Sequence, residues 1–572
     1  MQQQHKIEGS IVSVKQMTVK EILESYDEIT IDKEITDGIF LITVYGKKFL
    51  FIAPFEDEPA SMSTVYLFND DGLDFPHIML REKTFPNIEG LPEGNYRWVC
   101  LYEQENIVNT IVPYEDKVID AVDRLLKLIS MNEIEKEHEF QKEFMFYWNS
   151  YSTGQKKFDV YLAQENTFTE METYYGKNNV RIIEKGLRLS DIDSRDKAER
   201  KWVKHIENDV YFIPISDSRG ILPPHRGYRW TSQDIKNIVY APQVEHISVD
   251  TFQRIKETIP KTQNVILVFG MKSEESNVVF AVRLKCNNTV GHSLLEKILK
   301  DIVAVEPLFT TRKDYLYLSE QIGNDIGLLK KKVLVVGAGS LGSYITSELV
   351  KNGASNIKIY DGDKLEEENV LRWSCGSIGI GSNKAKTISF LLNLLHPEVN
   401  VEAVDKNIDE KTLVEEASQV DLIIFTVGNS DEQLKFNRAL KFARCSIPVI
   451  YVWLEEGGIY SHILIVDYQK TGCFECLYTD ENGNLVNNRA RKNSDAVLET
   501  AIIRNGCGGT RAAYGTAILL RTTAALLDAI HKIQMKKITE SVLIDVSQYN
   551  ISISDTKFPL EVCNCCGDRY RQ

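Results

Sequence analysis

An apolar segment that runs directly into a glycine-rich turn is the feature that most constrains how this chain folds. Residues 333–336 are apolar, and the six that follow read Gly-Ala-Gly-Ser-Leu-Gly. Such a turn joins a buried strand to a helix and lets backbone N–H groups approach a phosphate. Apolar residues then recur at helical spacing up to Gly353, where a left-handed cap would end the helix, and residues 357–360 read as the next parallel strand. The glycines expected at a nucleotide are Gly337, Gly339 and Gly342.

Charged residues after the turn indicate which nucleotide chemistry to expect. A Gly-x-Gly-x-x-Gly motif alone is weak, because NAD(P), FAD and ATP sites all contain it. Here Asp361 has the spacing of a ribose ligand, Asp363 follows it, and Asn369, Arg372 and Lys384 can hold phosphate oxygens. Hydride transfer does not need such a cluster, whereas an enzyme that breaks a phosphoanhydride does.

The motif from Gly337 to Lys384 resembles the adenylation domain of ubiquitin-activating enzymes and their bacterial ThiF and MoeB relatives. The resemblance extends from about residue 321 to the C-terminus and implies a Rossmann-like α/β domain that uses ATP and Mg²⁺. It also implies that Asp361 binds the ribose and that Asn369, Arg372 and Lys384 hold the triphosphate. In such enzymes a protein's C-terminal carboxylate attacks the α-phosphate and pyrophosphate leaves, so cationic groups neutralise the charge that builds up.

Two positions depart from the pattern of that family. Trp373 stands where the family usually has Gln after the arginine. Gly428 occupies the position of the magnesium-binding Asp that follows the fourth strand. Asp431 is the nearby candidate to replace it, and a solvated loop aspartate is the alternative.

Paired cysteines predict a structural metal site in a reducing compartment. The chain has ten cysteines, too few for a disulfide scaffold of 572 residues. Two Cys-x-x-Cys-like pairs provide four thiolates, the ligand set of structural Zn²⁺. We expect the metal on Cys473, Cys476, Cys563 and Cys566, with Cys565 as a substitute for Cys566, and reduced metal-free cysteines as the alternative.

Cys507 is the cysteine that we expect to accept the activated carboxyl group. It lies between glycines at the end of a polar segment, residues 479–511, and just before a predicted helix over residues 512–535. A helix N-terminus lowers a thiol pKa, and glycines leave it accessible. In the resembled family the catalytic cysteine lies on a mobile crossover loop after the metal-binding pair. An incidental cysteine in a glycine-rich cap is the alternative, and Cys375, nearer the expected ATP, is the second candidate nucleophile.

The N-terminal part resembles a ubiquitin-conjugating domain of the divergent bacterial kind. Three alternating runs within residues 38–68 predict an antiparallel meander, a proline-containing stretch leads to Cys100, and helices are predicted over 118–129 and 133–148. The resemblance implies an α+β domain whose Cys100 carries a thioester, and an inert buried cysteine is the alternative. The usual His-Pro-Asn triplet is absent. The candidates for stabilising the oxyanion are Asn87, Asn95 and His77, although a buried structural role is also expected for this histidine.

Length and charge set the organisation of the whole chain. With 572 residues it is too long for one core, and we expect an α/β multidomain protein with domains at 1–150, 151–320 and 321–572, the middle one a smaller α/β linker domain. A formal charge of −15 argues against nucleic-acid binding. No apolar run approaches the length of a membrane span, and no basic-apolar leader is apparent, so we expect a cytoplasmic protein.

An activating domain and a conjugating-like domain in one chain resemble the fused enzymes of bacterial CBASS anti-phage systems. That resemblance implies a protein substrate, a cGAS/DncV-like nucleotidyltransferase, whose C-terminus is adenylated, moved to Cys507, passed to Cys100 and joined to a target amine. It also implies a homodimer through the adenylation domains. The alternatives are a sulfur-carrier-type adenylyltransferase and a non-catalytic adaptor that binds ATP and a protein tail.

Overall fold

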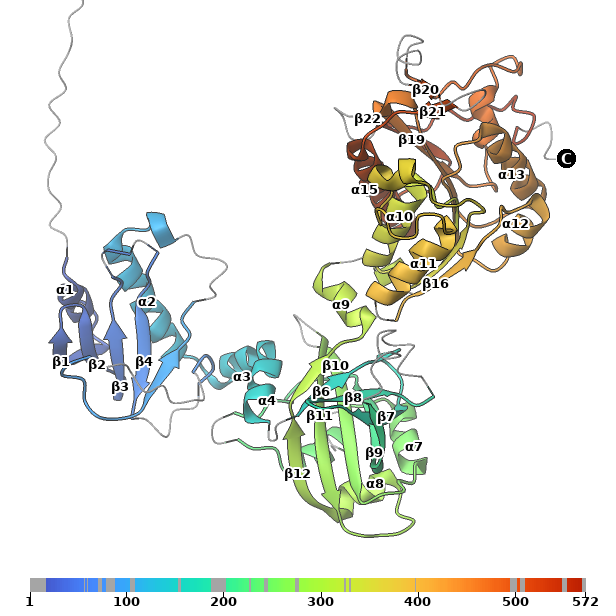
Figure 1. Cartoon of the computed structure of the whole chain (residues 1–572). Helices are drawn as coiled ribbons and strands as arrows, with labels where there is room; N and C mark the ends of the chain where they lie inside the picture. Colours follow the sequence, from blue (N-terminus) through green and yellow to red (C-terminus); the bar gives the residue numbers. More distant parts are fainter. Residues whose placement is uncertain are drawn as a thin grey trace, which may run out of the picture. The chain divides into compact units, whose positions relative to one another are not determined.

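The computed structural model describes residues 17–567, with gaps at 56, 59, 70–74, 79–87, 103–108, 153–155, 187–201, 226–227, 241–244, 273–276, 324–325, 329–330, 397, 494–501, 505–509 and 548–552. It is a mixed α/β protein that divides into two compact units (Figure 1). The first unit comprises residues 1–159, 164–185 and 203–311, and the second comprises 160–163, 186–202 and 312–572. None of the described helices is long and apolar enough to cross a membrane.

The second unit is built on an eight-stranded sheet with the order β16-β15-β14-β17-β18-β19-β22-β23. The first five strands in that order are parallel, and the last three are antiparallel. The parallel part has the strand order 3-2-1-4-5 of a Rossmann-like sheet, and its order reverses between β14 and β17. The strands are β14 (Lys332–Val336), β15 (Asn356–Tyr360), β16 (Asn400–Val404), β17 (Leu422–Phe425), β18 (Val449–Leu454), β19 (Tyr460–Val466), β22 (Val542–Ser547) and β23 (Ile553–Asp555).

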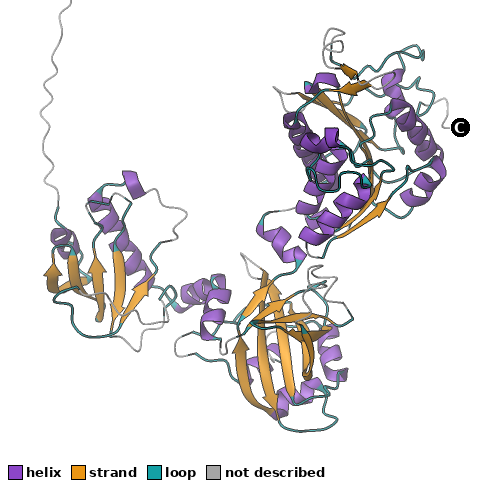
Figure 2. Cartoon of the chain, viewed as in Figure 1, coloured by secondary structure: helices purple, strands orange, loops and turns teal. Residues whose placement is uncertain are grey.

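Helices cover both faces of this sheet, as Figure 2 shows. Alternate residues of β14 point to opposite cores: Val333 and Val335 join one, and Leu334 and Val336 join the other. Both faces are therefore apolar, which explains why the strand reads as a continuous hydrophobic run. On one face lie α10 (Ser340–Lys351), α11 (Lys384–Leu395) and α15 (Thr516–Gln534), and on the other lie α12 (Glu410–Ala417) and α13 (Ser430–Phe442). The same unit contains α9 (Tyr315–Gln321), the short helices η6 (Glu367–Arg372) and η8 (Phe474–Tyr478), and the two-stranded pair β20 (Ile502–Arg504) and β21 (Thr510–Ala512).

The first unit begins with a five-stranded antiparallel meander in the order β1-β2-β3-β4-β5. One face packs against α2, whose Val118, Val122 and Leu125 are fully buried. The three strands expected from the sequence are present, together with a first and a last strand that the pattern did not predict. The elements are α1 (Val19–Glu24), β1 (Ile29–Thr36), β2 (Ile39–Val44), β3 (Lys47–Ile52), β4 (Thr64–Phe68), β5 (Tyr96–Val99) and α2 (Tyr114–Ile129).

An eight-stranded mixed sheet forms the rest of the first unit, in the order β12-β11-β10-β9-β7-β8-β6-β13. The predicted helix over 133–148 is two helices, α3 (Glu133–Lys142) and α4 (Phe144–Tyr151), and Phe144 and Trp148 of α4 belong to the core of this sheet. The strands are β6 (Lys157–Val160), β7 (Thr169–Tyr175), β8 (Asn179–Glu184), β9 (Val203–Ile215), β10 (Asn264–Lys272), β11 (Asn277–Cys286), β12 (Ile302–Leu308) and β13 (Thr310–Arg312). Its helices are α6 (Ser232–Val239), α7 (Val249–Glu257) and α8 (Leu294–Glu296).

Candidate nucleotide-binding and thiol sites

The glycine turn between β14 and α10 is closed by contacts that leave no room for a side chain at Gly337 or Gly342. Gly337 adopts φ +102°, and its N–H donates to the carbonyl of Tyr360 at 2.8 Å. A Cβ at Gly342 would lie 2.1 Å from the carbonyl oxygen of Gly337. The Thr426 hydroxyl donates to that same carbonyl at 2.9 Å. The motif is thus a strand-to-helix turn at the point where the strand order reverses, the usual place for a ligand in such sheets.

Asp361 holds the turn from the end of the neighbouring strand β15. Its carboxylate accepts the N–H of Ala338 at 2.6 Å and the N–H of Asp363 at 2.8 Å. Burial raises the pKa of Asp361, and these two N–H donors partly oppose the rise. The predicted ribose ligand therefore also positions the glycine turn.

Two adjoining cavities lie at this edge of the sheet and share Gly339, Lys384, Thr426 and Gly428. The first, the Asp361 cavity, has a volume of about 320 Å³; its other walls include Gly337, Asp361, Asp363, Asn407, Ile408, Glu432 and Phe436. The second, the Arg372 cavity, has a volume of about 430 Å³; its other walls include Asn369, Arg372, Trp373, Ser430, Gln433, Trp453, Glu456, Phe474, Asn488 and Tyr514. Of the eight positions predicted at the nucleotide, only Gly342 lines neither cavity, and it acts by packing inside the turn.

The predicted phosphate ligands converge on these cavities from two elements. Asn369 and Arg372 come from η6, and the Arg372 guanidinium lies 5.1 Å from the centre of the Tyr514 ring. Lys384 begins α11 and forms an ion pair with Asp363 at 3.0 Å. Because Lys384 lines both cavities, its ammonium can reach a ligand that spans them.

Trp373, which departs from the family pattern, is a support of the turn. Only 3% of its surface is exposed, and its indole N–H donates to the carbonyl of Ala338 at 2.9 Å. An indole donates one hydrogen bond and fills a large volume, so it can brace the turn from the interior while its edge contributes to the cavity wall.

The carboxylates at the cavities differ from the one expected for magnesium. Gly428 leaves open space, since a Cβ there would meet no atom within 4 Å. Among the described residues, Asp431 lines neither cavity, whereas Asp363 and Glu432 line the Asp361 cavity. Mg²⁺ bound with a nucleotide commonly uses the phosphates and one or two carboxylates. These two residues therefore fit a magnesium ion better than Asp431 does.

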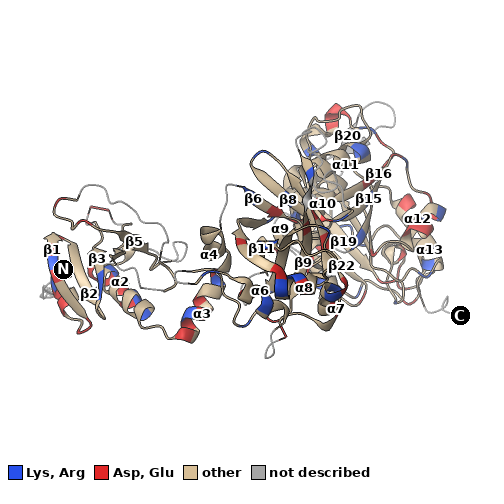
Figure 3. Cartoon of the chain, turned by 90° about the horizontal axis from the view of Figure 1, so that it is seen from below, with Lys and Arg blue, Asp and Glu red and all other residues tan. Residues whose placement is uncertain are grey.

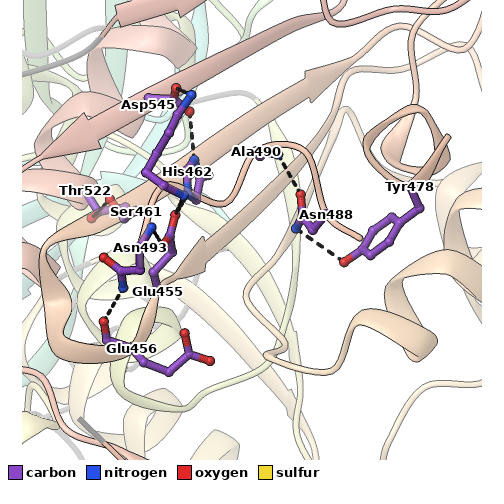
Figure 4. A network of polar contacts seen from close by, with 11 residues as sticks. Glu455, Glu456, Ser461, His462, Tyr478, Asn488, Ala490, Asn493, Thr522 and Asp545 are labelled. Atoms are coloured by element: carbon purple, nitrogen blue, oxygen red, sulfur yellow. Dashed lines mark hydrogen bonds and ion pairs between the residues drawn. The ribbon is translucent and has the colours of Figure 1, made fainter. Parts of the chain in front are cut away.

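A buried polar network fixes the chain segment that borders the Arg372 cavity (Figure 4). His462 lies between Asp545, at 2.8 Å from its Nδ1, and Glu455, at 2.7 Å from its Nε2. The Glu455 carboxylate also accepts the backbone N–H groups of Lys492 and Asn493, at 2.7 and 2.8 Å. Burial alone would lower the pKa of His462, but the hydrogen bonds that the two carboxylates accept from its ring raise it overall. Residues 492 and 493, within the predicted crossover segment, are thereby tied to the sheet.

Four cysteines from two distant segments meet in the second core. The Sγ atoms of Cys473, Cys476, Cys563 and Cys566 all lie within 4.8 Å of one another, and all four residues are buried. Two Sγ pairs are 3.9 and 3.4 Å apart, close to the roughly 3.8 Å edge of a tetrahedron with Zn–S bonds of about 2.3 Å. Cys565 instead faces Asn437, whose side-chain amide donates to its sulfur at 3.3 Å. The geometry fits a structural zinc on the four predicted residues.

Cys100 lies in a separate cavity of about 560 Å³ in the first unit. It directly follows β5, whereas Asn95 precedes β5, so the length of a strand separates them, roughly 16 Å at the usual rise. His77 lines the same cavity as Cys100. Of the three residues proposed for the oxyanion, the structure places His77 beside the cysteine and Asn95 away from it, and Asn87 lies outside the described residues.

Of the two other candidate nucleophiles, the structure describes Cys375 but not Cys507. Cys507 lies outside the described residues. Cys375 packs against the core of the second unit, and burial raises the pKa of its thiol. A thiol that stays protonated is a poor nucleophile, which favours a packing role for Cys375.

Several residues that line the two cavities were not predicted from the sequence. Thr426 follows β17 and Asn407 follows β16, so both stand at carboxyl ends of parallel strands, where sequence position alone gives a usable signal. Tyr514 offers no such signal, because it reaches Arg372 from a segment more than a hundred residues away.

A family model and several known proteins match part of this chain, and the family match falls on the part that holds the glycine turn. Residues 323–565 match the model of the ThiF family. The ATP-dependent ubiquitin transferase-like protein Cap2 of Pseudomonas aeruginosa is 28% identical over 233 residues, which are 40% of this chain and 41% of that protein. Ubiquitin-like modifier-activating enzyme 5 of Aedes aegypti is 28% identical over 159 residues, covering 26% of this chain and 40% of that protein. The crystal structure of Escherichia coli MccB with MccA-N7isoASN matches 42% of this chain and 68% of that one, at 19% identity and a TM-score of 0.34.

The matches fall on one part of the molecule. The chain spans about two fifths of the length of the two curated relatives described above. The family match covers the glycine turn, the Asp361 and Arg372 cavities and three of the four clustered cysteines, and Cys566 lies one residue beyond it. The C-terminal part of this chain, from residue 323 to residue 565, is therefore a ThiF domain.

Proposed function

We propose that the chain activates the C-terminal carboxylate of a protein with ATP and then conjugates that protein to an amine. One observation carries the first step: the glycine turn, Asp361, Arg372 and Lys384 converge on two adjoining cavities that share Lys384. The nucleoside would occupy the Asp361 cavity, and the triphosphate and the incoming carboxylate would meet in the Arg372 cavity.

The residues present suit adenylation. A carboxylate oxygen attacks the α-phosphorus, the bond to the bridging oxygen breaks, and pyrophosphate leaves with its negative charge. Arg372 and Lys384 neutralise that charge where it develops, and the N–H groups of the turn contact phosphate oxygens. Mg²⁺, held by Asp363 and Glu432 together with the phosphates, would supply further charge neutralisation.

The later steps follow from the resemblance to fused CBASS enzymes and are proposals throughout. The acyl group moves from AMP to Cys507, then to Cys100, and finally to a target amine in anti-phage defence. The protein substrate would be a cGAS/DncV-like nucleotidyltransferase. Each thiol exchange replaces one thioester by another of similar energy, so the ATP step supplies the driving force, and joining the domains raises the local concentration of the second thiol.

A homodimer through the adenylation domains is part of the same proposal. Large apolar side chains are exposed on the ThiF domain, among them Leu371 at 92%, Phe390 at 66% and Leu395 at 67%. The mass of the purified chain in solution tests this: a monomer at micromolar concentration would contradict it.

A lysine pair gives a matched test of the nucleotide site. Lys384 lines both cavities, whereas Lys386 on the same helix is exposed and pairs with Asp405. In Lys384→Met we expect ATP–pyrophosphate exchange, with the operon's nucleotidyltransferase as the substrate, to fall by about 10²-fold or more. In Lys386→Met the rate should stay close to that of the wild type. Equal rates in the two variants would contradict the placement of the triphosphate.

The alternatives predict other products. A sulfur-carrier-type enzyme would give a thiocarboxylate on the tail, and mass spectrometry would find no reductant-sensitive conjugate on Cys507. A non-catalytic adaptor would bind ATP and the tail without any pyrophosphate exchange. The first unit with its Cys100 cavity, which an adenylation domain alone does not need, favours the conjugating enzyme.

A further inference from the structure

His77 and Cys100 occupy neighbouring positions on two adjacent chain segments. Ile78 and Val99 form an antiparallel bridge, and both are buried in the core of the N-terminal meander. One step further along, the N–H of Cys100 donates to the carbonyl of His77 at 2.7 Å. Both residues line the 560 Å³ cavity, here called the Cys100 cavity. The histidine and the thiol therefore face the same space.

Two carboxylates hold the imidazole of His77. Its Nε2 lies 3.2 Å from Glu139, and its Nδ1 lies 3.4 Å from Glu143. The second distance exceeds that of a good hydrogen bond, so Glu143 is the looser partner. Glu143 is also the more exposed carboxylate, with 35% of its side chain accessible against 21% for Glu139. The two contacts are thus unequal, and the contact between Nδ1 and Glu143 is the weaker one.

These carboxylates come from the helices that follow the meander. Glu139 belongs to α3, along which acidic and basic residues are interspersed (Figure 3), and Glu143 stands between α3 and α4. Phe144 and Trp148 of α4 are buried in the core of the middle sheet. The Tyr147 hydroxyl accepts the N–H of His77 at 2.6 Å. The Cys100 cavity is therefore completed by residues anchored in the following domain.

The charge around His77 suits a proton acceptor. Burial alone would lower the pKa of His77, but the hydrogen bonds and charges of Glu143 and Glu139 raise it overall. The other charged groups at the cavity are Arg124 and Lys127 on α2 and Lys142 on α3, of which Lys142 pairs with Glu139 at 3.1 Å. A neutral imidazole that donates Nε2–H to a carboxylate is the usual arrangement of a general base.

We propose that His77 is the general base that removes a proton from the acceptor amine at Cys100, with Glu143 binding the incoming ammonium and Glu139 orienting the imidazole. The inference rests on the proposed thioester at Cys100. The ammonium enters between Nδ1 and Glu143, and Nδ1 takes one of its protons. The nitrogen then attacks the thioester carbonyl, the C–S bond breaks, and the Cys100 thiolate takes the proton from the imidazolium. The imidazole, neutral again, accepts the second proton that the nitrogen loses as the amide forms and releases it to solvent.

The test separates charging of Cys100 from its discharge. The full chain is loaded with ATP and the operon's nucleotidyltransferase, the thioester on Cys100 is quantified on non-reducing gels, and a single turnover is followed after adding free lysine or hydroxylamine. Lysine is an ammonium at neutral pH and needs a base, whereas hydroxylamine is already unprotonated. His77→Gln should charge normally and react with lysine about 10²-fold more slowly, with hydroxylamine cleavage nearly unchanged.

Two further variants test the role of Glu143. Glu143→Gln should slow the lysine reaction about tenfold, mainly through a higher lysine KM, because it removes the proposed ammonium site. Glu137→Gln, which changes an exposed carboxylate on the neighbouring helix α3, should behave as the wild type. The wild-type rate with lysine should also rise with pH through a titration that His77→Gln lacks.

Each other result overturns a defined statement. If His77→Gln slows lysine and hydroxylamine equally, or slows neither, His77 is not the base. If Glu143→Gln and Glu137→Gln match, Glu143 does not bind the amine. If the wild-type chain never forms a thioester on Cys100, the proposed function itself fails, and the inference fails with it.

Discussion

Single residues decide whether the ThiF domain can present a nucleotide site. Gly342 packs against the carbonyl of Gly337, and Trp373 donates to the carbonyl of Ala338. Asp361 binds the N–H of that same Ala338. The turn is therefore held from the helix side, from the core and from the neighbouring strand, and one added methyl group can disrupt it.

Two glycines near the nucleotide site provide a matched test of this packing. A methyl group at Gly342 would overlap backbone atoms, whereas one at Gly428 would meet nothing within 4 Å. We expect Gly342→Ala to destabilise the domain by about 2–4 kcal/mol, and Gly428→Ala to stay within about 0.5 kcal/mol of the wild type. Thermal unfolding of the two variants without nucleotide measures this. Similar unfolding midpoints would show that the turn adapts to the extra carbon.

Glu398 makes the stability of the ThiF domain depend on pH. Its Oε1 atom is buried without a hydrogen bond among the described residues, and its Oε2 accepts the N–H of Tyr315 at 3.1 Å. Burial raises the pKa of Glu398 from 4.5 to about 8. The folded state thus keeps a proton that the unfolded state loses, so stability falls as the pH rises from about 4.5 to about 8 and does not recover above that.

Replacing the carboxyl group of Glu398 should remove this loss of stability at high pH. Glu398→Gln keeps an acceptor for Tyr315 and carries no charge, so we expect it to be more stable than the wild type by about 1–3 kcal/mol at pH 8.5 and equal to it near pH 5. Denaturant unfolding at the two pH values measures the difference. The exposed Glu415→Gln serves as the control. A variant less stable than the wild type at pH 8.5 would contradict the buried, protonated carboxyl.

At the scale of elements, polar and thiol clusters join segments that the sheet alone does not hold. The His462 network ties residues 492 and 493 to β18, β19 and β22. The four-cysteine cluster joins the η8 segment to the C-terminal segment. Each cluster therefore adds side-chain contacts between segments that are distant in the sequence.

The adjacent cysteines near the C-terminus discriminate the metal ligands. Cys563 belongs to the four-sulfur cluster, whereas Cys565 faces Asn437. We expect Cys563→Ser to lose the zinc of the wild type and to unfold at a lower temperature, because the metal contributes directly to folding. Cys565→Ser should retain the full zinc content. Metal analysis by mass spectrometry measures both, and loss of zinc in Cys565→Ser alone would assign that sulfur to the metal instead of Cys566.

At the scale of the whole molecule, the chain joins a ThiF domain to a second unit with its own thiol cavity. In the proposed pathway, joining them would raise the effective concentration of one thiol near the other. The middle sheet contributes to the Cys100 cavity, since its core holds Phe144 of α4, the residue that directly follows Glu143 at the cavity.

Mixing two full-length variants tests whether the joined domains act on each other. We expect Cys100→Ser and Cys507→Ser each to be inactive in conjugation. Mixed at micromolar concentration, they should recover only a small part of the wild-type rate, and that part should grow with protein concentration, because transfer has become intermolecular. Full recovery independent of concentration would show that transfer within one chain is not required, as in a dimer that exchanges acyl groups between its subunits.

The sequence by itself determined the elements whose signals are local. The apolar run, the glycine turn and Gly353 predicted β14, α10 and its left-handed cap, because backbone freedom and helical periodicity are properties of neighbouring residues. The spacing of Asp361, Arg372 and Lys384 likewise located the charged side chains at one edge of a parallel sheet. The Cys-x-x-Cys pairing indicated four ligands before any distance was known.

Only the tertiary structure decided which distant groups meet. It brought Tyr514 to Arg372 and replaced Asp431 by Glu432 at the cavity, because strand order and helix rotation set those distances. It divided one predicted helix at Glu143 and placed its second half in another core, since burial of Phe144 and Trp148 outweighed helical continuity. The contacts of His77 with two carboxylates more than sixty positions away lie beyond any local pattern, since such partners are chosen by packing.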